Sequence, residues 1–185
     1  MSTSFIIALS VAAVVLVWLT AIYNELTKER ILVDEGLAGI DAGLQERYDL
    51  IPNLVETVKG YVGHEHKTLV EVIKWRNRGI DADSADDKAS ADKGMTQALA
   101  DFFSLSEAYP DLKANANFLA LQESLGGIEE KLNSARRYYN GTVREYNQSI
   151  AVFPKNLVAG GFGFRPRAFF SADDAARTAP GVKFN

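Results

Sequence analysis

The fold of this chain is decided by residues 5–62, which read FIIALSVAAVVLVWLTAIYNELTKERILVDEGLAGIDAGLQERYDLIPNLVETVKGYV. Residues 5–23 contain no charged side chain, and a helix of about 20 predominantly apolar residues crosses a bilayer core. The remainder continues without a clear helix stop signal, and a single helix over the whole stretch would be about 85 Å long. We therefore predict a membrane-spanning helix that continues into the rest of the protein.

The part of this stretch that follows the span carries an apolar stripe that repeats every three or four residues, as in a helix with one buried face. Its members are Val33, Leu37, Ile40, Leu44, Tyr48, Ile51, Val55, Val58 and Val62. Pro52 lies within the stripe, and proline removes a helical hydrogen bond, which produces a kink near Asp49 or starts a new helix. Because the stripe keeps its phase across Pro52, we predict a kink.

Three further helices are predicted downstream. Residues 65–78 form a short helix, residues 88–108 form a second, and the acidic residues 79–87 between them indicate a surface loop. The clearest helix has apolar residues at steps of three and four, namely Phe118, Leu121, Leu125, Ile128, Leu132, Ala135, Tyr139, Val143, Tyr146 and Ile150. The Gly-, Pro- and Phe-containing segment from residue 153 onward predicts an irregular tail held by aromatic side chains.

The predicted fold class is therefore all-α, with one core-forming domain besides the span. Residues 1–23 are expected to form an N-terminal segment and a transmembrane helix, and residues 24–152 a bundle of about four long antiparallel helices. Residues 153–185 form the irregular aromatic tail, which is expected to pack on the bundle or on a neighbouring subunit.

The apolar N-terminal segment is interpreted as a retained anchor and not as a cleaved signal peptide. The first four residues carry no Lys or Arg, and residues 20–23 offer no small-residue cleavage site. Lys28 and Arg30 follow the span, so the positive-inside rule places the C-terminal part in the cytoplasm. The predicted membrane-spanning residues are Phe5, Ile6, Ile7, Ala8, Leu9, Ala12, Val15, Leu16, Trp18, Leu19, Ile22 and Tyr23.

Composition argues against several classes of function. The chain has no cysteine, which excludes disulfides and thiolate metal sites, and its net charge of −4 argues against nucleic acid as a partner. Arg136, Arg137 and Arg144 share a segment with glutamates, and we expect them to pair with acidic residues of the first helix. No motif of a nucleophile, a phosphate loop or a catalytic dyad is present in the sequence, and we expect no cofactor.

The histidines His64 and His66, with Glu65 between them, are the best candidates for a metal site. Residues two apart on a helix point away from each other, and the zinc-protease pattern needs a different spacing, His-Glu-x-x-His. A bend after Gly63 would allow the two imidazoles to converge. A polar turn between helices explains these residues better than a metal site does.

Two groups of glycines interrupt the predicted long helices: Gly36, Gly39 and Gly43 in the first, and Gly126 and Gly127 in the last. A glycine inside a helix costs about 1 kcal/mol relative to alanine, a cost that close approach of two backbones offsets. We predict that the groups face each other, or face the same helices of a neighbouring subunit. The alternative is that they are exposed and merely tolerated.

Several ordered runs resemble the LemA family of bacterial membrane proteins. They are RYDLIPNLVETVKGY (residues 47–61), EAYPDLKAN (107–115), ARRYYN (135–140), FPKNLVA (153–159) and the Phe169-Phe170 pair. The resemblance implies one membrane span in the bacterial cytoplasmic membrane and a cytoplasmic antiparallel bundle. It implies no catalytic residues, and it suggests a membrane metalloprotease as a partner. The chain departs from the family pattern between Asp34 and Glu46, where glycines replace a basic run.

Three functions are compatible with these observations. The first is a non-enzymatic scaffold that contacts lipid through its span and forms homo-oligomers through its long helix. Its expected contact residues are Gly39, Gly43, Gly126, Gly127, Phe162 and Phe164. The second is a monomeric adaptor that presents its bundle to another membrane protein, such as a metalloprotease. The third is a weak metal-dependent enzyme that uses His64 and His66.

Overall fold

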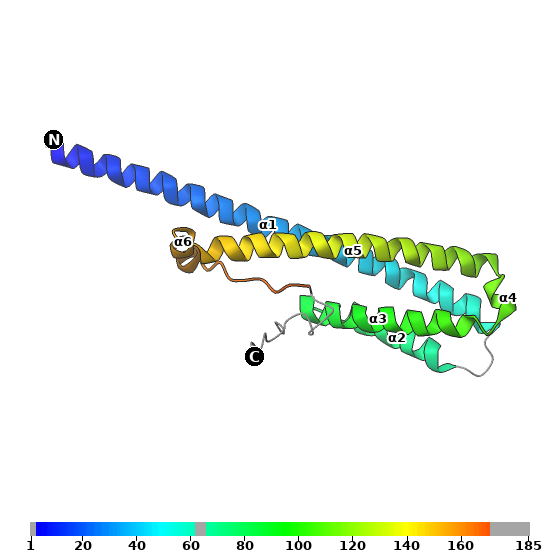
Figure 1. Ribbon diagram of the computed structural model, residues 1–185. Helices are drawn as coiled ribbons and strands as arrows, with labels where there is room; N and C mark the ends of the chain where they lie inside the picture. Colours follow the sequence, from blue (N-terminus) through cyan, green and yellow to red (C-terminus); the bar gives the residue numbers. More distant parts are fainter. Residues whose placement is uncertain (1–2, 62–65, 171–185) are drawn as a thin grey trace, which may run out of the picture.

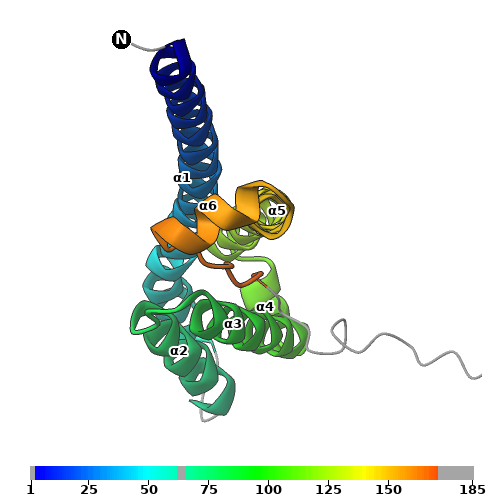
Figure 2. The same cartoon turned by 90° about the vertical axis from the view of Figure 1, so that its left-hand side faces the viewer.

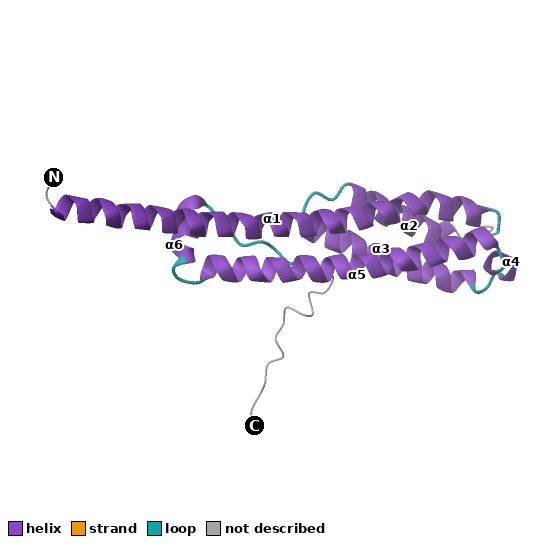
Figure 3. Ribbon diagram, turned by 90° about the horizontal axis from the view of Figure 1, so that it is seen from above, coloured by secondary structure: helices purple, strands orange, loops and turns teal. Residues whose placement is uncertain are grey.

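The computed structural model describes residues 3–61 and 66–170, which form an elongated bundle around one very long helix (Figure 1). The helices are α1 (Thr3–Lys59), α2 (His66–Ile80), α3 (Ala85–Ser106), α4 (Pro110–Lys113), α5 (Ala116–Ala151) and α6 (Lys155–Phe162). The described residues contain no strand, which confirms the predicted all-α class. Seen from above, the molecule is a rod from which the first part of α1 projects (Figure 3).

Helix α1 passes without interruption from an exposed apolar end into the bundle. Among the described helices it alone is long and apolar enough to cross a membrane. It continues through Pro52, so the alternative of a new helix at this proline is wrong. The predicted stripe is buried or half-buried from Val33 to Val58, while Val62 lies outside the described residues.

Helix α5 packs antiparallel along the second part of α1, and this pairing is the most extensive in the molecule (Figure 1). The stripe predicted for α5 provides its side of the contact, since Leu125, Ile128, Leu132, Tyr139, Val143 and Tyr146 are all buried. Leucine, isoleucine and valine side chains removed from water stabilise a fold by about 1.5–3 kcal/mol each. The two stripes therefore hold the bundle together along most of its length.

Helices α2 and α3 form a hairpin that lies against the far part of α1. Helix α3 begins three residues earlier than predicted because Ser84 caps it: the backbone N–H of Asp87 donates to Ser84 Oγ over 3.0 Å. The predicted loop is correspondingly shorter. At the other end of α3, the rings of Phe102, Phe103 and Phe118 pack together, which joins α3 to the start of α5.

The tail contains a short helix, α6, that the sequence analysis did not predict. Beyond α6 the chain is extended to residue 170 and lies along α5. Two asparagines of α5 hold it. The side-chain amide of each asparagine donates a hydrogen bond to the backbone carbonyl of one tail residue and accepts one from the N–H of the same residue. Asn147 pairs in this way with Arg167, and Asn140 with Phe170, at 2.9–3.0 Å. Residues 171–185, the remainder of the predicted aromatic tail, lie outside the described part of the chain.

The two glycine groups do not meet within one chain, contrary to the first form of the prediction. A Cβ added to Gly36 would lie 3.1 Å from the Tyr139 Cα, and one added to Gly43 would lie 2.8 Å from a Leu132 methyl group. These two glycines therefore allow α5 to approach closely, but the residues of α5 that face them are the larger Tyr139 and Leu132. Gly39, Gly126 and Gly127 have open space around the added atom. Their contact with a neighbouring subunit stays a prediction.

Leucine substitutions at two neighbouring glycines of α1 should have opposite effects. Gly36→Leu should destabilise the protein by about 1–3 kcal/mol because the side chain meets the α5 backbone, which cannot move aside without separating the helices. Gly39→Leu should stabilise it by up to about 1 kcal/mol through helix propensity. Thermal unfolding of both variants in detergent measures the difference, and a destabilised Gly39→Leu monomer would contradict the open environment of this position.

Candidate functional site

The predicted membrane-spanning residues form an apolar surface that no other part of the bundle covers. Every described residue up to Trp18 is exposed, including the large side chains of Phe5, Leu9 and Leu16. Contiguous apolar surface of this extent is not stable in water and marks a membrane or protein contact. Burial begins only at Leu19 and Ile22, which join the hydrophobic core.

An aromatic group, here called the aromatic collar and made of Tyr23, Phe162 and Phe164, lies at the end of this apolar segment. The Tyr23 ring lies edge-on to the Phe162 ring at 5.1 Å and to the Phe164 ring at 5.6 Å. The Arg30 guanidinium lies over the Phe164 ring at 5.2 Å. Phe164 is 7% exposed and Phe162 63%. The tail thus packs on its own chain through Phe164, and Phe162 remains largely uncovered.

Charged side chains that follow the span hold the tail in place. Lys155 Nζ lies 2.8 Å from Glu25 Oε1, and Arg167 lies 2.7 Å from Asp34. Near this level, Ser149 Oγ of α5 donates to Glu29 over 2.8 Å, which joins α5 itself to α1. Figure 2 shows α6 crossing α1 at this level, so these contacts place α6 beside the end of the span.

A buried charge network (Arg47, Asp92, Glu129 and Arg136) joins α1, α3 and α5 in the middle of the bundle. Arg47 Nη1 lies 2.9 Å from Asp92 Oδ1, and its Nη2 lies 3.1 Å from Glu129. Arg136 binds the other oxygen of Asp92 and lies 3.1 Å from Glu129. Thr96 accepts a further hydrogen bond from Arg47. Each guanidinium therefore bridges both carboxylates.

Burial dominates the electrostatics of this network. Asp92 is 1% exposed, and burial raises the pKa of its carboxyl above the ordinary value, while the Arg136 and Arg47 guanidiniums lower it. Removing one partner from such a cluster leaves an uncompensated charge, so the network favours a single register of the three helices.

A groove of about 680 Å³ borders the charge network on the α2–α3 side. Trp75 lines it and packs against Gly94, where any added Cβ would collide with the indole ring. Lys74 and Arg78 lie over the same ring at 5.7 and 5.1 Å. The glycine thus has a packing role that its sequence position alone does not indicate.

The sequence analysis missed the charge network, although its spacing carries a signal. Arg47 lies three residues after Leu44, Asp92 three before Met95, and Arg136 four after Leu132, so each falls on the buried side of its helix. The expected pairing of Arg136 with acidic residues of the first helix is wrong, since it binds Asp92 of α3 and Glu129 of its own helix. Arg137 bonds Ser134 of its own helix.

The structure does not test the candidate metal cluster. His64 and Glu65 lie outside the described residues, and α2 begins at His66, whose side chain is not described. Among the residues that the structure does describe, no three His, Cys, Asp or Glu side chains are grouped as metal ligands. Metal binding at this turn stays an untested alternative.

Tyr48 places a hydroxyl in the core between α1 and α2. Within the described part of the chain, this hydroxyl has no hydrogen-bonding partner. It occupies the place that a Cβ at position 79 would take, which explains why residue 79 is a glycine. Burial, followed by the negative charge of Asp92, raises the pKa of Tyr48 to about 12.

Comparison with known proteins agrees with the resemblance seen in the sequence. The model of the LemA family matches residues 36–184. The protein LemA of Metamycoplasma hominis is 25% identical over 158 residues, which cover 83% of this chain and 71% of that protein. Together with the apolar part of α1, the match indicates a membrane-associated protein.

Magnetosome proteins are also similar. Magnetosome protein MamQ 2 of Paramagnetospirillum magneticum is 24% identical over 161 residues, and MamQ of Magnetospirillum gryphiswaldense is 23% identical over the same length. In both cases the match covers 73% of this chain and 59% of the relative. This chain therefore spans only a little over half the length of the magnetosome relatives.

Removing the central carboxylate of the charge network should destabilise the protein strongly. Asp92→Ala leaves Arg47 and Arg136 without their shared partner and should cost about 3–5 kcal/mol. Asp101→Ala on the same helix removes an exposed carboxylate bonded to Gln97 and should change stability by less than about 0.5 kcal/mol. Denaturant unfolding in detergent compares the two, and equal effects would show that the network does not hold the bundle.

Replacing Tyr48 with phenylalanine should leave stability at neutral pH within about 1 kcal/mol of the parent, because it removes a buried hydroxyl that has no partner. Tyr139→Phe is the matched control: it loses a hydrogen bond to the Ala168 carbonyl and should cost about 1 kcal/mol. A larger loss for Tyr48→Phe than for the control would mean that this hydroxyl is bonded.

Tyr48 should also make the fold sensitive to alkali. Its folded pKa, about 12, exceeds the ordinary value of 10.0, so its contribution to stability is complete below pH 10 and is lost as the pH rises toward 12. The parent should therefore lose more stability over this range than Tyr48→Phe does. Unfolding curves at several alkaline pH values measure the difference.

Proposed function

This chain belongs to the LemA family, and we propose that it is a non-enzymatic, single-pass protein of the bacterial cytoplasmic membrane that self-associates as a scaffold. The observation that carries the proposal is the continuity of α1, which is apolar and exposed at one end and packed against α5 at the other. A helix without a break transmits the position of the span to the bundle. The bundle would therefore stand in a defined orientation on the membrane.

The bundle's internal contacts support a scaffold more than a catalyst. The α1–α5 stripes and the charge network link three helices into one rigid rod. The carboxylates of this network are engaged by arginines and so are not free to act as general bases. The rod presents an extended lateral surface to partner proteins.

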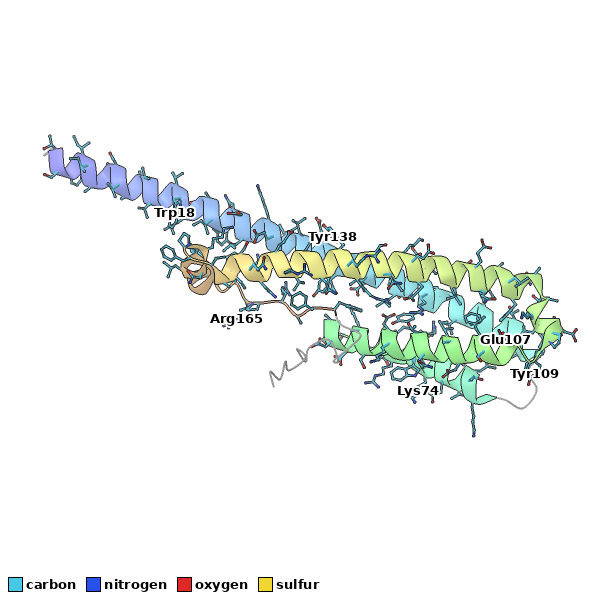
Figure 4. All side chains as sticks on the ribbon, in the orientation of Figure 1. Trp18, Lys74, Glu107, Tyr109, Tyr138 and Arg165 are labelled. Carbon is cyan, nitrogen blue, oxygen red and sulfur yellow. The ribbon has the colours of Figure 1, made fainter. Side chains whose placement is uncertain are left out.

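Self-association is supported by exposed glycines and exposed apolar side chains that other described parts of the same chain do not cover. Gly39, Gly126 and Gly127 expose helical backbone to open space, so they would allow another helix to approach closely. Tyr138 is an exposed side chain beside Gly36, and Figure 4 shows it where α1 and α5 cross. Leu32, one helical turn before Gly36, is also exposed. In the first turns of α1, Ser4, Ala8 and Ala12 repeat the small-residue spacing of packed membrane helices.

An adaptor function uses the same architecture without self-association. In that case the exposed glycines and Tyr138 would contact another membrane protein, such as a metalloprotease. Lys28 and Arg30 next to the span favour a cytoplasmic bundle for either function. The two functions differ in the mass of the intact protein.

The intact protein, extracted into native nanodiscs, should have a mass that is a discrete multiple of the 20.3 kDa chain. Gly39→Leu should reduce this multiple because the added side chain blocks helix approach at an open backbone position. Gly60→Leu is the control, since this glycine is equally open but lies beyond the end of α1. Mass photometry of the three samples measures assembly, and a single-subunit mass for the parent would favour the adaptor.

A further inference from the structure

Helix α6 and the turn before it lie at the end of the bundle from which α1 projects (Figures 1 and 2). Four exposed apolar side chains of this segment, Val152, Phe153, Leu157 and Phe162, are here called the apolar cap. Phe153 is 76% exposed, Leu157 67% and Phe162 63%. Exposed apolar side chains grouped in one segment are typical of a membrane or protein contact.

The apolar cap lies beside the end of the membrane-spanning segment. Phe162 contacts Tyr23 through its ring, and Lys155 in the first turn of α6 pairs with Glu25. Figure 4 shows Trp18 on α1 at this same end of the molecule. Trp and Tyr side chains are typical of the level where hydrocarbon meets the headgroups. The collar and the apolar cap therefore share one depth.

The length of the exposed part of α1 also sets this depth. Residues 3–18 are exposed, and at about 1.5 Å per residue they rise about 24 Å. A hydrocarbon core is about 30 Å thick. The bilayer must therefore extend past Trp18 toward the collar, or become thinner around the protein.

We propose that α6 lies in the interfacial layer of the bilayer, with the apolar cap inserted among the lipid headgroups and the upper acyl chains. The proposal rests on the membrane span of the proposed function and adds a second membrane contact. The partner is lipid because the apolar cap continues the apolar surface of α1, whose partner is also lipid. Exposed apolar side chains flanked by basic residues bind at this layer.

The polar groups of α6 are arranged in a way that permits this position. The charge of Lys155 is balanced by Glu25, at 2.8 Å. Gly163 adopts a left-handed conformation, with φ 74°, that ends the helix, and the Phe164 N–H donates to the Ala159 carbonyl over 3.0 Å. Backbone groups that are bonded internally can be placed near hydrocarbon at low cost.

Basic side chains complete the interfacial contact. Lys28 and Arg165 are exposed at this end, and Figure 4 shows Arg165 beside α6 on the side away from the span. Their positions suit lipid phosphates, which attract Lys and Arg near a membrane surface. Two membrane contacts, the span and α6, would limit the rotation and tilt of the rod.

Single-cysteine labelling in the intact protein tests this proposal, because the natural chain has no cysteine. Phe153→Cys and Leu157→Cys would each carry an environment-sensitive fluorophore in nanodiscs with lipids bearing a nitroxide near the headgroup or near the chain end. We expect a blue-shifted emission at both positions and stronger quenching by the shallow nitroxide. Helical circular dichroism equal to that of the parent establishes that each variant is folded.

Two control positions separate this proposal from the membrane anchor itself. Leu119→Cys, 48% exposed near the start of α5, lies at the far end of the bundle and should be quenched by neither lipid. Val11→Cys in the span should be quenched by the deep nitroxide. If Val11 is not quenched, the membrane anchor fails and the present proposal fails with it.

If the label at Val11 is quenched and the labels at Phe153 and Leu157 are not, only the interfacial position of α6 is overturned. A different result is a blue-shifted emission that neither nitroxide quenches. If this emission shifts to the red when the sample is diluted into empty nanodiscs, the partner of the apolar cap is a second copy of the chain. A water-like emission at both positions would mean that the apolar cap lies clear of the bilayer.

Discussion

The antiparallel contact between α1 and α5 is the interaction on which the rest of the structure depends. Without α5, the second half of α1 would expose its apolar stripe to water, and a long isolated helix is held mainly by such packing. With α5 in place, the same stripe orients α1 about its axis. Gly36 and Gly43 strengthen this dependence, because the absence of side chains lets α5 approach α1 closely.

The charge network adds specificity to a contact that is otherwise apolar. Two continuous apolar stripes can slide past each other by one helical turn with little loss of burial. Arg47, Asp92 and Arg136 remove this freedom, since a shift of one turn would separate buried charges. The network also joins the α2–α3 hairpin to the central pair, so one set of contacts positions three helices.

The end of the bundle that carries α6 combines two opposite requirements. In the proposed membrane position its surface is apolar toward the bilayer, while α6 and the extended tail are held to the bundle by polar contacts. Ion pairs from Lys155 and Arg167 and the paired amides of Asn140 and Asn147 meet the second requirement on the side that faces the bundle. The exposed face of α6 is left free of charge for the first.

The sequence by itself determined the all-α class, the exposed apolar N-terminal segment and the buried faces of α1 and α5. These features depend on composition and on a period of about 3.6 residues, which are local properties. Only the tertiary structure decided which charges meet, because Arg47, Asp92 and Arg136 lie on three helices far apart in the chain. It also decided that Gly36 faces Tyr139, while Gly39, three residues away, faces open space. The relative rotation and register of two helices set such pairs, and neither is a property of one segment.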